Sequence, residues 1–354
     1  MTLIKRYRTA GLLTLAAAMA FSTAACSNPG KQETVQEQPP GNTAPEKPSN
    51  TAETPVPETP APHTFPLTGL GTEQPVTERP LMFMVENSPK ARPQSGLDQA
   101  DIVYEVLAEG EITRFLAVFQ SQAAETVGPV RSIRPYFVQL GEELDAVMVH
   151  AGWSQDAMNI LTGHRLDHFD EVYGDGAYYW RDKSRKMPHN LYSSVAKIRD
   201  AVEDRKKRQE WMPVDLQFAA KDAPAPAGTP AVKIAIPYIA GYDVGYEYDA
   251  AAGLYKRVME GKPHEDRITG KQLTASNVLI CYTKHQVLDK AGRRNVDIYG
   301  PGKGYLVQKG VAQEITWENK GGAIRAYKDG QELSLIPGQT WVQIVPNGSK
   351  VTFE

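Results

Sequence analysis

The sequence predicts an α+β protein in two parts, a mixed α/β domain followed by a smaller β-rich domain that is a sandwich or a barrel. Between residues 64 and 220, short apolar runs alternate with stretches of helical spacing. From 231 to 354, nearly every apolar run is short and bounded by turn residues. The Pro- and Ala-rich stretch at 221–230 separates the two regions, so we expect a linker there.

Residues 1–25 have the pattern of a signal peptide. A cationic start precedes an apolar run of modest length from Leu12 to Phe21 and a small-residue end, and this run is too short to cross a membrane. Cys26 follows Thr23-Ala24-Ala25, which resembles the bacterial lipobox, where the cysteine becomes the lipidated first residue. The alternative is an ordinary signal peptide followed by an unmodified cysteine. We expect an exported protein with its lipid on Cys26.

Residues 26–63 are predicted to be the lipidated Cys26 and a disordered tether. Pro, Glu, Thr, Asn and Gln dominate this stretch, which has too little apolar surface to offset its ordering entropy. A Pro-rich chain of this length would reach up to roughly 100 Å from the bilayer.

Composition excludes several classes of protein. The net charge of −3 over 354 residues gives no indication of a nucleic-acid partner. The two cysteines, Cys26 and Cys281, provide neither a disulfide framework nor a cysteine metal site if Cys26 carries lipid. Cys281 lies in Asn-Val-Leu-Ile-Cys-Tyr and is expected to be a small apolar residue of a buried strand.

The elements expected around the centre of the first region follow from local patterns. Apolar and β-branched runs at 102–108 and 112–120 predict a hairpin joined at Glu109-Gly110-Glu111. Residues 136–144 have helical spacing directly after Pro135, a residue that the first turn of a helix tolerates. Further elements are expected at 81–86, 146–150, 157–162 and 193–211, and as strands at 232–236, 242–248, 254–259, 278–282, 296–299, 305–308, 313–318, 323–328 and 340–345.

Arg131, Ser132 and Arg134 are predicted to lie at the start of that helix. Two guanidinium groups beside unpaired backbone N–H groups form a cradle for an anion. On the preceding strand, Glu105 and Glu109 share a face, and a charge inside an apolar run needs a partner. Either the arginines neutralise these carboxylates as a structural ion network, or they line a polar cleft for an anionic ligand.

Two further sets of residues are candidates for the same kind of role. His150 is expected at the carboxyl end of a strand, where α/β folds often bind ligands, and joins the anion cleft. Aromatic and charged side chains at 178–181, with His189 in a later loop, suit stacking on sugar rings, and with equal weight they suit the core of a folded loop. These residues are Tyr178, Tyr179, Trp180, Arg181 and His189.

Three other motifs are weaker. His164 and His168 have the i, i+4 spacing of metal ligands on a helix but lack an apolar face that would bury them. Residues 300–304 are rich in glycine but precede a strand, so a β-turn is favoured over a phosphate loop. Ser154 does not lie in a nucleophile elbow. We therefore predict no metal site and no cofactor, and assign no catalytic residue.

Several segments together resemble the YerB-like family of bacterial lipoproteins, over nearly all of the predicted exported part. This resemblance implies an envelope lipoprotein with an N-terminal α/β domain and a smaller C-terminal β domain, and no established activity comes with it. The segments are Arg79-Pro80-Leu81, Glu86-Asn87, 91–97, 100–105, 128–137, 149–152, 188–192 and 337–341.

Two classes of function fit these observations. The first is a membrane-anchored extracytoplasmic lipoprotein that binds an envelope ligand, namely a cell-wall glycan, an anionic ligand or a protein partner. The alternative is an enzyme acting on a phosphorylated envelope glycan or a lipid-linked substrate, with Arg131 and Arg134 on the phosphate and Glu105 or Glu109 as base or metal ligand. The order of acidic strand, hairpin and arginine-rich turn loosely resembles the LytR-CpsA-Psr ligases, whose motifs are not matched here. We favour the first class.

Overall fold

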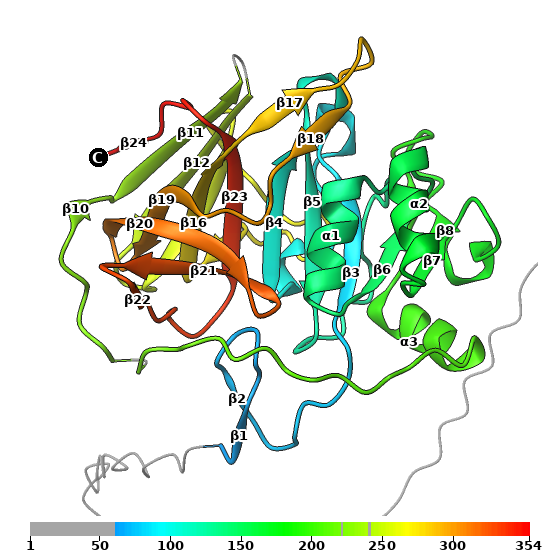
Figure 1. The fold of residues 1–354 in the computed structure, drawn as a ribbon, viewed down its shortest axis with the longest axis horizontal. Helices are drawn as coiled ribbons and strands as arrows, with labels where there is room; N and C mark the ends of the chain where they lie inside the picture. Colours follow the sequence, from blue (N-terminus) through cyan, green and yellow to red (C-terminus); the bar gives the residue numbers. More distant parts are fainter. Residues whose placement is uncertain (1–60, 221, 240–241) are drawn as a thin grey trace, which may run out of the picture. The chain divides into compact units, whose positions relative to one another are not determined.

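A computed structural model describes residues 61–220, 222–239 and 242–354. Its largest sheet has twelve strands in the order β22-β21-β20-β19-β16-β23-β4-β5-β3-β6-β7, with β10 pairing with β20 (Figure 1). In chain order these strands are β3 (Leu81–Glu86), β4 (Ile102–Leu107), β5 (Thr113–Phe119), β6 (Val147–His150), β7 (His168–Asp170), β10 (Thr229–Pro230), β16 (Asn277–Thr283), β19 (Gly302–Gln308), β20 (Val311–Lys320), β21 (Ala323–Lys328), β22 (Gln331–Glu332) and β23 (Thr340–Pro346).

The central strands β3, β4 and β5 are buried on both faces, which explains their nearly continuous apolar sequences. Helices α1 (Pro135–Glu143) and α2 (Gln155–Gly163) pack on one face through the core cluster that contains Phe137 and Leu161. Helix α3 (Val195–Asp204) packs on the other face through Ile198. The sheet is therefore the middle layer of the fold.

A second sheet of six strands, β14-β13-β12-β11-β24 with β15 beside β13, belongs to the same core cluster as α3. Buried and exposed residues alternate along β11 and β12, as expected for a sheet with one face packed and one face in water. Its strands are β11 (Lys233–Ile239), β12 (Tyr242–Asp249), β13 (Leu254–Met259), β14 (Lys262–Pro263), β15 (Thr274–Ala275) and β24 (Thr352–Phe353). Three two-stranded sheets complete the fold: β1 (His63–Thr64) with β2 (Gly71–Thr72), β8 (Trp180–Arg181) with β9 (Leu191–Tyr192), and β17 (His285–Val287) with β18 (Arg294–Val296).

The predicted fold class is confirmed: α/β structure occupies the N-terminal half and strands the C-terminal half. The sheet crosses between the halves, because β23 pairs in parallel with β4 from Ile102 to Val106. The two halves also share a core cluster, so they cannot separate without opening that sheet. The boundaries predicted from sequence, including the linker at 221–230, stay a prediction.

Two element predictions need correction. The helix expected at 193–211 ends at Asp204, and Lys206 has a left-handed backbone conformation with φ of 50°. In the basic run that follows, Lys207 pairs with Asp167 at 3.1 Å between Nζ and Oδ1. The strand expected at 296–299 is displaced towards the N-terminus, since β18 ends at Val296.

Cys281 lies fully buried in β16, as expected, and burial raises the pKa of its thiol. None of the helices in the described ranges is long and apolar enough to cross a membrane. The predicted signal peptide at 1–25, Cys26 and the tether up to residue 60 lie outside the described residues.

Candidate functional site

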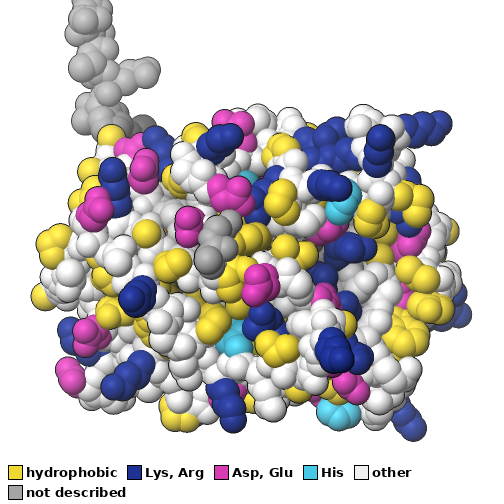
Figure 2. Space-filling view, turned by 90° about the horizontal axis from the view of Figure 1, so that it is seen from above, with side chains coloured by type: hydrophobic (Ala, Val, Ile, Leu, Met, Phe, Trp, Pro, Cys, Tyr) yellow, Lys and Arg dark blue, Asp and Glu magenta, His cyan; other side chains and the backbone are white. Residues whose placement is uncertain are grey.

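Eight strands of the large sheet run in the same direction; they are β3, β4, β6, β7, β16, β20, β22 and β23. Their carboxyl ends therefore meet at one edge, where open α/β sheets commonly bind ligands. Figure 2 looks down on this edge from above and shows basic and acidic side chains interspersed across it.

Glu86, the last residue of β3, is the most deeply buried carboxylate of the site, with 2% of the residue exposed. Ser88 donates a hydrogen bond to its Oε1 at 2.7 Å, and the Nδ1 atom of His189 lies 3.0 Å from each carboxylate oxygen. The Nε atom of Arg131 lies 3.5 Å from Oε2. Three groups from three parts of the chain thus converge on one acid.

The segment that carries Arg131 lies beside β3 and pairs with it through an isolated β-bridge between Val130 and Val85. Arg131 N–H donates to the carbonyl of Met84, and Val130 N–H donates to Leu191. Gly128 begins this segment with φ of 150°, and a Cβ atom there would lie 2.7 Å from the carbonyl oxygen of Leu191. The glycine permits the close approach that positions Arg131 over the end of β3.

Two further arginines converge on Glu109 in the turn between β4 and β5. Buried Arg114 on β5 donates from Nη2 to Glu109 at 3.2 Å and from Nη1 to the carbonyl of Ser132 at 2.6 Å. Arg134, the N-cap residue of α1, donates from Nε to the same carboxylate. Burial lowers the pKa of Arg114 to about 10 and also lowers that of Arg134.

We call Glu86, Glu109, Arg114, Arg131 and Arg134 the arginine cluster. Three guanidinium groups face two carboxylates, which leaves one formal positive charge. Arg131 is the most open of the three cations, with 34% of its side chain exposed against 17% for Arg134. Of the three, only Arg131 has no hydrogen bond from its guanidinium within the described residues.

The structure gives Glu105 a different partner from the one considered at the sequence level. Its side chain is fully buried, and its Oε2 atom accepts a hydrogen bond at 2.6 Å from Nη2 of Arg257 on β13. Neither Arg131 nor Arg134 reaches it, so Glu105 belongs to the core between the two sheets and not to the arginine cluster.

His150 ends β6 as predicted, but its side chain is fully buried and faces away from solvent. Nδ1 lies 3.1 Å from the carbonyl oxygen of Gly152, and Nε2 lies 3.1 Å from Nδ1 of His168. Burial, with His168 alongside, lowers the pKa of His150 to about 3, so the ring is neutral at physiological pH. The hydroxyl of Ser132 is also engaged within the protein, because it donates a hydrogen bond to the carbonyl of Ala151 at 2.9 Å.

The aromatic stretch at 178–181 packs mainly within its own loop. The hydroxyl of buried Tyr179 donates to the carbonyl of Phe169 at 2.9 Å, and Tyr178 packs edge-on against the same phenylalanine. Trp180 stacks on Tyr192, and Arg181 pairs with Glu171. Of the two alternatives, these contacts favour a folded loop over a surface for sugar rings. His189 is the exception, since it belongs beside Glu86.

The weaker motifs have local structural roles. His164 caps the end of α2 and its Nδ1 lies 2.7 Å from Glu142, whereas His168 lies on β7. No group of three or more potential metal ligands occurs among the described residues. Ser154 is the N-cap of α2, where its side chain accepts a hydrogen bond from Ala157.

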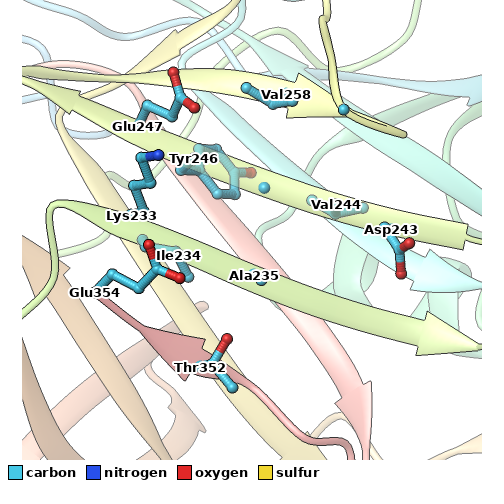
Figure 3. Close-up of a pocket in the computed structure, with 12 residues that line it drawn as sticks. Lys233, Ile234, Ala235, Asp243, Val244, Tyr246, Glu247, Val258, Thr352 and Glu354 are labelled. Carbon is cyan, nitrogen blue, oxygen red and sulfur yellow. The ribbon is translucent and has the colours of Figure 1, made fainter.

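A hollow of about 280 Å³ lies on the outer face of the six-stranded sheet, over β11 and β12 (Figure 3). One lysine, Lys233, and three carboxylates, those of Asp243, Glu247 and Glu354, line it. Its formal charge is therefore opposite in sign to that of the arginine cluster, and it does not suit an anion.

Sequence reasoning missed Glu86 and Arg114 as members of the site. Glu86 ends an apolar strand and Arg114 lies inside one, a signal like the one that drew attention to Glu105. This signal alone does not distinguish a charged residue paired in the core from one that belongs to the candidate site. The distinction depends on the partner residues, which come from distant parts of the chain.

Together, the fold and the site define an α+β protein with two interlocked halves and a net positive arginine cluster at the carboxyl edge of its central sheet. Models of the N-terminal and C-terminal domains of a protein family of unknown function (DUF3048) match residues 67–208 and 234–342. The chain belongs to this family, which confirms the YerB-like resemblance.

A curated relative and a solved structure agree with this assignment. The chain is 45% identical over 298 residues to the "Putative lipoprotein YerB" of Bacillus subtilis (strain 168), and the match covers 82% of this chain and 89% of that protein. The crystal structure of the YerB protein from Bacillus subtilis matches with a TM-score of 0.75 and 41% identity, over 82% of this chain and 99% of that one.

Proposed function

We propose that this protein is a lipoprotein held at the outer face of the bacterial cell membrane by a lipid on Cys26, and that its folded part binds an anionic ligand of the envelope at the arginine cluster. The relative named as a putative lipoprotein supports the anchor, as does the signal-peptide pattern that ends at Cys26. Phosphate or carboxylate groups on a cell-wall polymer, a smaller envelope ligand or an envelope protein all have the required chemistry.

The observation that carries this proposal is the state of Arg131. Arg114 and Arg134 each donate to the carboxylate of Glu109 and to a backbone carbonyl, so their guanidinium groups are largely engaged. Among the described residues, Arg131 has one ion pair, with Glu86 at 3.5 Å, and its side chain is one-third exposed. Backbone hydrogen bonds with Met84 and Ala151 fix the main chain of Arg131, while its partly exposed guanidinium keeps paired donors available, which suits an anion.

One observation favours the alternative, an enzyme acting on a phosphorylated envelope substrate. His189 is bound by Glu86 through Nδ1 and has 18% of its side chain exposed, which is the arrangement by which a carboxylate orients an imidazole for general acid–base catalysis. Arg131 beside the same carboxylate would hold a phosphate group within reach of that ring.

The ligand class is tested by a thermal-shift screen of the parent protein against inorganic phosphate, sulfate and soluble envelope glycans. A ligand of the folded state raises the melting temperature by mass action. We expect phosphate and sulfate to stabilise the protein more than chloride at equal ionic strength. The same melting temperature in all three salts would remove the basis for an anion site.

The anchor is tested separately by Cys26→Ala. The variant removes only the predicted lipidation site, so it should leave the membrane fraction and retain the melting temperature of the parent. Fractionation of cells with blotting measures the first, and thermal unfolding the second. Membrane retention equal to that of the parent would show that Cys26 is not the anchor.

A further inference from the structure

A second concave surface lies on the C-terminal half, over the strands β16, β19, β20 and β21. One hollow of about 550 Å³ and a neighbouring one of about 480 Å³ share Tyr282 and Lys303 in their linings, so they adjoin. We call this surface the tyrosine groove. At its closer end it reaches the carboxyl end of β16, which is four strands from β3 in the sheet order and so about 19 Å from the strand that carries Glu86.

Three tyrosine rings, of Tyr282, Tyr305 and Tyr327, line the groove. The ring centroids of Tyr282 and Tyr305 are 6.2 Å apart, and Tyr305 also packs edge-on against Phe353 at 4.9 Å. All three rings are only partly buried. Rings that are braced on one side and open on the other offer flat apolar faces at little entropic cost.

Polar side chains come between these rings. The strand register pairs Lys303 with Thr316 and Thr316 with Tyr327, so the three form one cross-strand row on the same face. Glu314 lies opposite Tyr305 in the next row. The ammonium groups of three lining lysines have no ion pair or side-chain hydrogen bond among the described residues; they are Lys284, Lys303 and Lys328.

We propose that the tyrosine groove binds a glycan strand built from N-acetylhexosamine rings. A pyranose ring has apolar C–H faces, which stack on tyrosines, and hydroxyl and amide groups at its rim, which hydrogen-bond to both donors and acceptors. The groove provides lysine donors, the carboxylates of Glu314 and Asp329, and the hydroxyl of Thr316. These mixed charges do not favour a polyanion, and the interspersed polar groups do not favour a purely apolar ligand.

This inference goes beyond the anionic ligand of the arginine cluster and stands on separate residues. The test is a calorimetric titration of the full-length protein in detergent with tetra-N-acetylchitotetraose, together with a pull-down on purified peptidoglycan, which distinguishes the free oligosaccharide from the cell-wall source. We expect both to bind. Tyr327→Ala should weaken chitotetraose binding about fivefold, whereas Tyr327→Phe, which keeps the ring, should bind like the parent.

The matched control is Tyr173→Ala, because Tyr173 is 66% exposed and lies outside the groove. It should leave glycan binding unchanged. Arg131→Gln should also leave it unchanged, and Tyr327→Ala should leave any phosphate-dependent thermal shift unchanged, so the two sites can fail independently. Absence of binding to both glycans, or equal binding by Tyr327→Ala and the parent, overturns the proposal. A proline-rich peptide with the sequence of residues 39–60 that binds in place of the glycans also overturns it, in favour of a peptide groove.

Discussion

The protein has two glutamate–arginine pairs that look alike in sequence but differ in structure. Glu105 and Arg257 are both completely buried between the two sheets, 2.6 Å apart. Glu86 and Arg131 meet at the carboxyl edge at 3.5 Å, and Arg131 is one-third exposed. We call Glu105 and Arg257 the closed pair and Glu86 and Arg131 the open pair. The closed pair finds its partners within the protein, whereas Arg131 of the open pair keeps guanidinium donors available for a ligand.

The buried pair is satisfied in detail. Arg257 also donates from Nε to Nδ1 of His264 at 3.0 Å and from Nη1 to the hydroxyl of Tyr246 at 2.6 Å, and its guanidinium lies 4.4 Å from the ring centre of Trp341. Since arginine only donates, His264 must accept at Nδ1 and carry its proton on Nε2, which lies 2.8 Å from Gln94. Burial, and Arg257 beside it, accordingly lower the pKa of His264.

The contrast therefore predicts two different effects of substitution. Neutralising one residue of the closed pair should lower the unfolding free energy, whereas neutralising Arg131 of the open pair should weaken anion binding. Burial alone would lower the pKa of Arg257, but Glu105 and Tyr246 hold it above its ordinary value. Arg257 is therefore charged in the folded protein.

Replacing Glu105 should have the largest effect. Glu105→Gln leaves Arg257 buried without a counter-charge, which should cost about 3–5 kcal/mol of unfolding free energy in urea titrations. The exposed Glu247 on β12 is the matched control, and Glu247→Gln should change the free energy by less than about 0.5 kcal/mol. The double variant Glu105→Leu with Arg257→Met should recover most of the loss, because no charge is then buried. Equal stability of the two Gln variants would show that the closed pair does not hold the halves together.

Lowering the pH should have the next largest effect, through buried neutral histidines. The pKa of His150 is about 3 in the folded protein, below the ordinary value of 6.5, so between these values the unfolded chain binds a proton that the folded chain does not. The contribution of His150 to the unfolding free energy should therefore be constant above about pH 6.5. It should fall towards pH 3 by up to about 1.4 kcal/mol per pH unit.

The pKa of His168 is also lowered by burial, and it adds a slope of the same sign. His150→Gln should reduce the slope of unfolding free energy between pH 6 and 4. His164→Gln, at a side chain with 56% exposure, is the control and should keep the slope of the parent. An unchanged slope in His150→Gln would contradict a neutral buried ring.

Arg134 should give a smaller effect that sharpens the comparison within the arginine cluster. Arg134→Ala removes one of the two arginines on Glu109, but Arg114 remains at 3.2 Å. The side chains of Arg134 and Glu109 are both partly exposed, so the cost should be about 1 kcal/mol. Glu109→Gln removes the partner of both arginines and should cost more than Arg134→Ala. The reverse order in chemical unfolding would mean that Arg134 acts through another contact.

The sequence predicted those features that depend on neighbouring residues. The hairpin at Glu109-Gly110-Glu111 and the helix that begins at Pro135 follow from alternation, turn residues and the preference of proline for the first helical turn. The alternating strands of the C-terminal half were also recognisable, because one face of that sheet packs and the other is in water.

The partners of buried charges could not be predicted in the same way. Glu105 and Arg257 are 152 positions apart, and Glu86 and His189 are 103 positions apart, so no local pattern links them. One signal was nevertheless present. Arg257 alternates with Tyr255 and Met259 along β13, which places a positive charge on the buried face of that strand just as Glu105 places a negative charge inside β4. Two unmatched buried charges of opposite sign predict a pair.

The central claim, that the open pair serves a ligand while the closed pair serves the fold, is tested most directly by the phosphate-dependent melting temperature of Arg131→Gln. Without phosphate, this variant should melt within a few degrees of the parent, because a partly exposed charge contributes little to stability. Saturating phosphate should raise the melting temperature of the parent but not that of Arg131→Gln. The control is Arg165→Gln, at an exposed arginine outside the cluster, and it should respond to phosphate like the parent. Two results would contradict the account. One is an equal phosphate response in Arg131→Gln and the parent. The other is that Arg131→Gln melts early and phosphate does not stabilise the parent.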